Sequence, residues 1–179
     1  MNRLNEQKKR ILLIDLVLFV VLVILDQATK YAAVMHLKDK PASPLINGVL
    51  ELNYLENRGA AFGLLQNQKV FCVLIAIVIL FVIGYVLILM PEDKKYTKMH
   101  VLLVVMASGA CGNMIDRFRT DYVVDFISFV IIHFPIFNVA DIYVTVSTLL
   151  FILLFLFVYK ENDFAFLSFA QQKKYREFK

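Results

Sequence analysis

The chain has 179 residues, of which 60% are hydrophobic and 19% are charged, and its mean hydropathy is +0.69. A soluble domain is about 45–50% apolar and about 25% charged, so this chain carries more apolar surface than one compact core can bury. The composition excludes an ordinary globular protein, a disordered tail and a collagen-like fibre. It indicates a single-domain bilayer protein, because about 150 residues per domain leave no room for a second domain.

Four apolar stretches are long enough to cross a bilayer as helices. A charge left in hydrocarbon must be paired or is costly, so a span is a stretch with few ionisable residues. A helix of about 20 residues crosses the roughly 30 Å hydrocarbon core. We therefore expect an all-α, multi-pass membrane protein with four transmembrane helices, at about residues 11–31, 70–90, 99–115 and 136–159.

Lysine and arginine are distributed unevenly over the connections between these spans. Most of the 19 lie at the amino end, between the second and third spans, or at the carboxyl end. The positive-inside rule then places both termini in the cytoplasm and the other two connections outside. The net charge of +4 is spread over membrane flanks, which suits contact with anionic membrane lipids and forms no focused nucleic-acid patch.

The two ends of the chain are also basic. At the amino end, residues 8–10 (Lys-Lys-Arg) precede an apolar run as in a secretory signal peptide. No clear small-x-small cleavage site ends that run, so we expect an uncleaved first helix. Residues 1–160 are expected to form one four-helix transmembrane domain. Residues 161–179 mix aromatic and basic side chains, and we expect a cytoplasmic tail that is either interfacial or disordered.

Neither the cysteines nor the histidines form a ligand cluster. Cys72 and Cys111 fall inside apolar spans, where a thiol behaves as a small hydrophobe. The three histidines are scattered singly. We therefore expect no disulfide framework, no metal and no cofactor.

Polar residues near the membrane are concentrated on the side assigned to the outside of the cell. A transporter would be expected to carry polar groups through the midplane. Asp15 is the exception, and we expect it to reach the opposite interface near Arg10. The concentration of polar residues on one side indicates a functional site that is reached from the outer surface of the membrane. The residues concerned are Asp26, Lys30, Asn57, Arg58, Asn113, Asp116, Arg117, Asp125, Asn138 and Asp141.

Two groups of these residues each share one helix face. Asp26 and Lys30 are four residues apart, with the acid on the amino-terminal side that favours pairing. We expect them to pair at the bilayer edge in a structural role, with catalysis by a desolvated Lys30 as the alternative. Asn113, Asp116 and Arg117 share a face of the third span in the same way, and we expect Asp116 to pair with Arg117.

The connection between the first two spans is expected to form a small extracytoplasmic β-element at about residues 45–66. Two prolines and an Asn-Gly turn break the helix. Leu50, Leu52 and Tyr54 then alternate with polar residues, which is the period of a half-buried strand. The segment 57–63 (Asn-Arg-Gly-Ala-Ala-Phe-Gly) follows, and its glycines permit close backbone approach. A plain turn-rich loop is the alternative.

Asp125 and Asp141 are the candidate catalytic pair. Asp125 closes the charged turn after the third span, and Asp141 lies in the first turns of the fourth, so an antiparallel connection brings both to one depth. Two carboxyls close together in a low-dielectric setting cannot both ionise, which provides a base and an acid in one place. The alternative is that each carboxylate is bound to Arg117, Arg119 or a backbone group.

Five short motifs extend in order from the first span to the fourth, and each is weak alone. They are Asp26-Gln27-x-Thr29-Lys30, Asn57-Arg58-Gly59-Ala60-Ala61-Phe62, Gly112-Asn113-x-x-Asp116-Arg117, Val124-Asp125-Phe126 and Phe137-Asn138-x-Ala140-Asp141. Together, in this order, they resemble the bacterial signal peptidase II family, the lipoprotein signal peptidases.

The resemblance implies an aspartyl endopeptidase of the bacterial inner membrane. It would remove the signal peptide from diacylglyceryl-modified prolipoproteins, cutting before the lipidated cysteine, with its active site at the extracytoplasmic leaflet. A monomer is expected. The alternatives are a small outer-leaflet lipid or solute transporter and a non-enzymatic scaffold. A different intramembrane aspartyl protease would need a Gly-x-Gly-Asp motif, and the sequence contains none.

The resemblance also implies roles for single residues. The catalytic aspartates of the family correspond to Asp125 and Asp141, with Asp116 as the alternative acid. Arg117 would stabilise the acidic cluster, and Asp26 and Lys30 would contribute structurally. The residues expected to support the site or hold the substrate backbone are Asn57, Arg58, Gly59, Asn113, Arg117 and Asn138.

Overall fold

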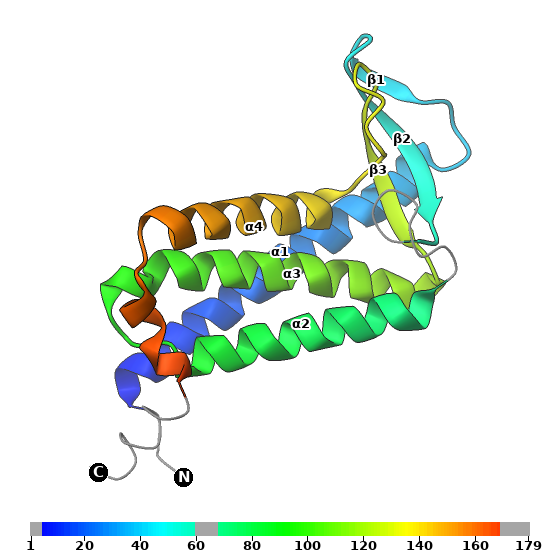
Figure 1. Ribbon diagram of the computed structural model, residues 1–179. Helices are drawn as coiled ribbons and strands as arrows, with labels where there is room; N and C mark the ends of the chain where they lie inside the picture. Colours follow the sequence, from blue (N-terminus) through cyan, green and yellow to red (C-terminus); the bar gives the residue numbers. More distant parts are fainter. Residues whose placement is uncertain (1–4, 60–67, 169–179) are drawn as a thin grey trace.

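The computed structural model describes residues 5–59 and 68–168. Four long helices form a bundle, and a small sheet stands at one end of it (Figure 1). The helices are α1 (Glu6–Leu37), α2 (Lys69–Leu89), α3 (Thr97–Thr120) and α4 (Val139–Phe157). All four are long and apolar enough to cross a membrane, which confirms the predicted four-helix membrane fold. The parts of the predicted β-element and tail at 60–66 and 169–179 lie outside the described residues.

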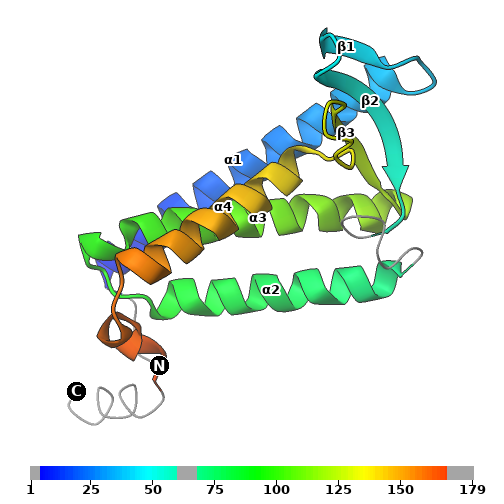
Figure 2. The ribbon, with the colours of Figure 1, turned by 45° about the horizontal axis from the view of Figure 1, so that its top comes forward.

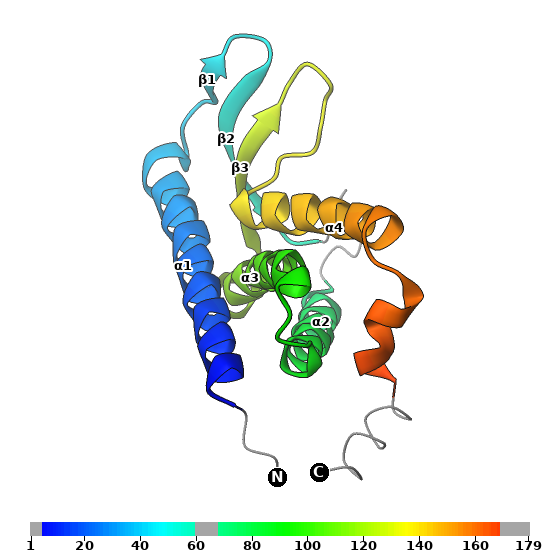
Figure 3. The same ribbon diagram turned by 90° about the vertical axis from the view of Figure 1, so that its left-hand side faces the viewer.

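Helix α3 is the centre of the bundle. It packs against α1, α2 and α4, and Figure 3 shows it between the other helices. Its glycines allow this close packing. A Cβ atom at Gly109 would lie 2.5 Å from the carbonyl oxygen of Ala140 on α4, and a Cβ at Gly112 would collide with the carboxylate of Asp26 on α1. The small residues of α3 thus bring α1 and α4 together.

The outer helices are covered by apolar side chains that face away from the protein. In the most apolar window of each of α1, α2 and α4, only 11% of the residues are buried, against 50% for α3. The exposed residues include long rows of Leu, Ile, Val and Phe. Lipid tails are as apolar as these side chains, so this exposure is expected of a membrane bundle.

The sheet combines strands from two connections. Strands β1 (Ser43–Ile46) and β2 (Leu50–Asn57) follow α1, and β3 (Val123–Phe129) lies between α3 and α4. All pairs are antiparallel, in the order β1-β2-β3, and Figure 2 shows the sheet above the end of the bundle. The predicted β-element is confirmed, but β3 was not predicted, and Asp125 lies in this strand rather than in a turn. Pairing of β2 with β3 aligns Leu55 with Asp125 and brings the two connections together.

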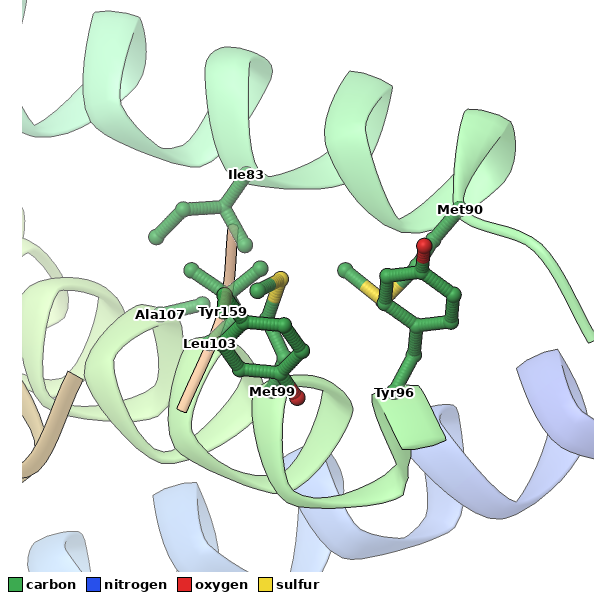
Figure 4. Packing of buried hydrophobic residues seen from close by; sticks show 7 residues of the cluster. All are labelled: Ile83, Met90, Tyr96, Met99, Leu103, Ala107 and Tyr159. Carbon is green, nitrogen blue, oxygen red and sulfur yellow. The ribbon is translucent and has the colours of Figure 1, made fainter. Parts of the chain in front are cut away.

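The opposite end of the bundle, where α1 begins and α4 ends, has an apolar core. Residues of α2 and α3 pack there with Tyr159, as Figure 4 shows. A short 3-10 helix, η3 (Glu161–Leu167), follows α4. The ring of Tyr96 stacks on Tyr159 at 5.9 Å and meets Phe166 edge-on at 5.7 Å. The first residues after Tyr159 therefore pack against the connection between α2 and α3.

Two charged side chains of α1 are buried at this same end. Asp15 is only 8% exposed, and its Oδ2 lies 2.7 Å from Nδ1 of His100 on α3. The prediction that Asp15 reaches the interface near Arg10 is wrong, because the packing of α1 on α3 supplies a buried partner. The ammonium of Lys8 donates to the carbonyl oxygens of Leu87 (2.8 Å) and Met90 (2.5 Å) at the end of α2.

Candidate active site

Most of the polar residues predicted to form the site meet at the sheet end of the bundle. Helices α1 and α3 contribute from their last turns, α4 from its first turn, and β2 and β3 from the sheet. Asp26, Lys30, Asp116, Asp125 and Asn138 are all buried. Segments from every part of the chain thus converge on one buried cluster.

Lys30 is the cation of this cluster. Its Nζ lies 3.0 Å from Oδ2 of Asp26 and 2.9 Å from Oδ2 of Asp116, and it donates to Oδ1 of Asn113 at 2.7 Å. The predicted pairing with Asp26 is confirmed, whereas Asp116 pairs with Lys30 and not with Arg117. The three N–H bonds of the ammonium meet three acceptors. This arrangement suits a structural cation better than a base.

Gln27 links the two acids of the cluster. It belongs to the first sequence motif, but no role was predicted for it. Its Nε2 lies 2.9 Å from Oδ1 of Asp116, 3.1 Å from Oδ2 of Asp26 and 3.2 Å from the carbonyl oxygen of Gly112. Asp26 also accepts the backbone N–H of Ala140 on α4, at 3.0 Å. A polar residue next to a buried acid in an apolar span was the available signal.

Asn138 and Asp141 form the N-terminal capping box of α4. Oδ1 of Asn138 accepts the backbone N–H of Asp141 at 3.0 Å, and Oδ2 of Asp141 accepts the backbone N–H of Asn138 at 3.1 Å. Each side chain thereby satisfies an N–H that the first helical turn leaves unpaired. The other oxygen of Asp141 accepts Nδ2 of Asn113 at 2.8 Å. Its carboxylate is therefore bound at both oxygens.

Asp125 on β3 is 1% exposed. Its Oδ1 accepts Nδ2 of Asn138 at 2.6 Å, and its Oδ2 accepts Nδ2 of Asn57 at 2.8 Å. Burial raises its pKa to about 6, with a further contribution from the negative charge of Asp141, while the amide hydrogen bonds act in the opposite direction. Asn138 thus contacts both aspartates, which interact electrostatically as the sequence predicted.

The two arginines expected at the site have different environments. Arg117 donates from Nη2 to the carbonyl oxygen of Gly59 (2.7 Å) and from Nη1 to that of Asn113 (3.2 Å). It therefore fixes the end of β2 against α3. Arg58 is exposed, lies 3.8 Å from Glu56 and is positioned over the ring of Tyr122 at 5.5 Å. The hydrogen-bond donors described for Asp125 and Asp141 are amides rather than guanidinium groups.

Comparison with known proteins matches the arrangement to one family. The model of the signal peptidase (SPase) II family matches residues 18–174. The chain belongs to the signal peptidase II family. Lipoprotein signal peptidases from Streptococcus pyogenes serotype M1 and serotype M5 (strain Manfredo) are each 40% identical to it over 157 residues, which cover 88% of this chain and 98% of theirs.

Solved structures agree with this assignment. A bacterial membrane enzyme solved by the in meso method at 2.3 Å resolution has a TM-score of 0.71 and 35% identity, covering 79% of this chain and 87% of that one. A second, at 1.9 Å resolution, has a TM-score of 0.70 and 36% identity, covering 81% and 94%. The predicted signal peptidase II family and its aspartic peptidase activity are confirmed.

Several carboxyl groups lie close together at the sheet end of the bundle. Within residues 5–59 and 68–168, no group of three or more His, Cys, Asp and Glu side chains could hold a metal ion. A pair of carboxyls with one shared proton can take a proton from water and supply another to a carbonyl oxygen. Asp125 and Asp141 are two carboxyls that both bind Asn138.

Proposed function

We propose that this chain removes signal peptides from diacylglyceryl-modified bacterial prolipoproteins with Asp125 and Asp141 as its catalytic dyad. The residue assignment rests on Asn138, whose side chain donates to Asp125 and whose backbone N–H donates to Asp141. The name lipoprotein signal peptidase of its relatives supports the substrate class. The transporter alternative is not favoured, because the family is a peptidase family.

The reaction follows from the protonation of the dyad. One aspartate, as a carboxylate, takes a proton from water, and the water oxygen attacks the scissile carbonyl carbon. The other aspartate, as a carboxylic acid, gives its proton to the carbonyl oxygen, so a neutral tetrahedral diol forms. When the C–N bond breaks, the first aspartate gives its proton to the leaving cysteine nitrogen and the second recovers one from the diol.

The surrounding residues have supporting roles in this proposal. Asn57, Asn113 and Asn138 orient the two carboxyls through their amide N–H groups. Arg117 fixes Gly59 and, with it, the end of β2. Arg58 is the exposed cation beside the site and meets the incoming substrate backbone. Asp26, Lys30 and Asp116 form a structural ion cluster, which leaves Asp116 without a role as the acid.

We further propose that the protein is a monomer in the bacterial inner membrane, with both termini in the cytoplasm and the dyad in the extracytoplasmic leaflet. The distribution of lysine and arginine supports this orientation. The acyl chains of the substrate would lie in the same leaflet as the dyad. The membrane itself then positions the scissile bond, which lowers the entropic cost of the reaction.

The test of the function compares lipidated and unlipidated forms of one precursor with the full-length protein in detergent micelles. We expect only the lipidated form to be cleaved before its cysteine, with the products identified by mass spectrometry. Cleavage of neither form, together with lipid movement in vesicles, would support the transporter instead. Equal cleavage of both forms would contradict the substrate class.

The test of the dyad uses Asp125→Asn and Asp141→Asn. Each variant is expected to lower kcat/KM by about 10³-fold or more, because general acid or base catalysis contributes about 10²–10⁴-fold. Thermal unfolding should remain cooperative in both. Asp116→Asn is the matched control, and its activity should fall only as far as its folded fraction does. Near wild-type cleavage by either dyad variant would exclude the residue assignment.

A further inference from the structure

The three asparagines around the dyad each have a fixed amide orientation. An amide oxygen cannot donate a hydrogen bond, so it must face a donor, and the NH2 group then faces the other way. Each of these oxygens faces a group that can only donate. The donors are the Gly59 N–H for Asn57 (2.9 Å), the Lys30 ammonium for Asn113 (2.7 Å) and the Asp141 N–H for Asn138 (3.0 Å).

As a result, every oxygen of the dyad accepts an N–H, but the donors differ between the two aspartates. Within residues 5–59 and 68–168, the donors to Asp125 are the neutral side-chain amides of Asn57 and Asn138. Asp141 accepts a backbone N–H in the first turn of α4, where the helix dipole favours negative charge. Its second donor is Asn113. The ionised form is therefore better stabilised at Asp141.

Asn113 connects Asp141 to a cation. The Lys30 ammonium donates to Oδ1 of Asn113, and Nδ2 of the same amide donates to Asp141. Hydrogen bonds in series polarise one another, so the amide transmits part of the positive charge. Nδ2 of Asn138 also donates to Oδ1 of Asn113, at 3.2 Å, so two donors hold the amide with its NH2 group toward Asp141.

The other charged groups around Asp141 come from α1, α3 and the sheet. Lys30 pairs with both Asp26 on α1 and Asp116 on α3, so its single positive charge offsets one of these two carboxylates. Arg117 on α3 adds a second cation, whose guanidinium donates to the carbonyl oxygen of Asn113, the residue whose side chain binds Asp141. From the sheet, Asp125 is the opposing acid. One proton bound to the dyad therefore reduces the negative charge of the site. We expect this proton on Asp125, because the donors to Asp141 include a backbone N–H and an amide that is bound to Lys30.

We propose that Lys30, acting through Asn113, keeps Asp141 ionised as the general base and leaves the catalytic proton on Asp125, the general acid. This assignment rests on the proposed function of the dyad. Lys30 is a positioning residue, because its ammonium is bound by Asp26, Asp116 and Asn113 and acts on Asp141 through Asn113. Burial raises the pKa of Asp125 to about 6, so this carboxyl keeps a proton at a higher pH than an ordinary carboxyl does.

The proton balance of one turnover is then specific to each residue. Asp141 accepts a proton from water as the water oxygen bonds to the scissile carbon, and Asp125 gives its proton to the carbonyl oxygen. Asp141 next gives its proton to the departing amine, and the diol hydroxyl returns one to Asp125. Both residues finish in the state in which they began.

A first experiment labels the wild-type protein, so that no variant has to fold. An epoxide on a lipidated peptide is opened by a carboxylate, whereas a diazoketone on the same peptide loses N2 and esterifies a protonated carboxyl. Peptide mapping by mass spectrometry is expected to find the epoxide on Asp141 and the diazoketone on Asp125. The reversed pattern would overturn the assignment, as would labelling of one aspartate by both reagents.

A second experiment tests the connection through Asn113 by the pH dependence of kcat/KM. The acid limb reports protonation of the base, and the basic limb reports loss of the proton from the acid. Asn113→Leu is expected to move the acid limb up by about one pH unit, because the ionised form loses a donor. The matched variant Asn57→Leu is expected to move the basic limb up by a similar amount. Asn113→Ser, whose hydroxyl is too short to join Lys30 to Asp141, replaces Asn113→Leu if that variant unfolds.

The outcomes separate this inference from the function on which it rests. An inactive, folded wild type would refute the proposed function itself. If the wild type is active but Asn113→Leu moves the basic limb and Asn57→Leu moves the acid limb, Asp125 would be the base. Unmoved limbs with a uniformly lower kcat/KM would mean that the asparagines only place the aspartates and that Lys30 has no influence on them.

Discussion

The bundle buries charged side chains at both of its ends, but it connects them differently. At the sheet end, Lys30 binds two carboxylates and, through Asn113, reaches Asp141. At the opposite end, Asp15 binds His100, whose Nε2 has no hydrogen-bond partner in the described part of the chain. One end has a branched network that leads to the proposed catalytic pair, and the other has an Asp15–His100 pair that joins α1 to α3.

This difference shows why burial of charge alone does not identify a functional site. Removing two charges from water costs several kcal/mol per ion, and their attraction does not always repay it. An isolated buried pair can often be replaced by apolar residues without loss of stability. A network whose last members are the proposed catalytic carboxyls could not be replaced in this way without loss of the proposed chemistry.

The largest effect is expected from Lys30→Met, which leaves Asp26 and Asp116 buried without their cation. Breaking a buried ion pair costs about 3–5 kcal/mol, so the midpoint temperature of thermal unfolding in detergent should fall by roughly 10 °C. Cleavage activity should be lost as well. Lys8→Met at the opposite end is the matched control. It removes hydrogen bonds to Leu87 and Met90 and should cost about 1–3 kcal/mol with cleavage retained by the folded protein. Equal losses of activity would remove the distinction between the two ends.

The next effect is expected from His100→Leu, which leaves the buried Asp15 carboxylate without its donor. We expect a loss of about 3 kcal/mol in the free energy of unfolding. The double variant Asp15→Leu/His100→Leu should recover most of it, and the kcat of the folded protein should be unchanged in both. A double variant that is as unstable as His100→Leu would mean that the Asp15–His100 pair stabilises the protein by more than a packing contact between α1 and α3.

A smaller effect is expected from Gly112→Ala, because its Cβ would collide with the Asp26 carboxylate. Overpacking of this kind costs about 1–3 kcal/mol, and displacement of Asp26 should also lower kcat. Gly84→Ala on α2 is the control, since its Cβ would meet no atom within 4 Å. It should be neutral or stabilising by up to about 1 kcal/mol. Thermal unfolding and cleavage rates of the two variants together measure how tightly the sheet end is packed.

The smallest effect is expected from Tyr159→Phe at the opposite end. The variant loses the hydrogen bond from the tyrosine hydroxyl to the carbonyl oxygen of Lys95, 2.8 Å long, but keeps the aromatic stack. A loss of about 1 kcal/mol is expected, with kcat and KM unchanged. A clear change in kcat would indicate that the two ends are coupled.

Patterns within one helix were predictable, and contacts between helices were not. The Asp26 and Lys30 pair follows from four-residue spacing, which fixes neighbours on one helix. The same reasoning assigned Arg117 to Asp116, but Lys30 of α1 takes that place. It also left Asp15 beside Arg10, because nothing in the sequence shows that His100 of α3 lies at the same depth.

The amino-acid sequence by itself determined four membrane-spanning helices, the collection of polar residues at one end, and the two aspartates that the motifs indicate. These features depend on the polarity of individual residues, since an unpaired charge is very unfavourable in hydrocarbon. Only the tertiary structure decided that β3 presents Asp125 to Asn57 and Asn138, and that Asn113 joins Lys30 to Asp141. Such contacts depend on how glycine-lined helices approach one another and on strand register, which are properties of the packed chain.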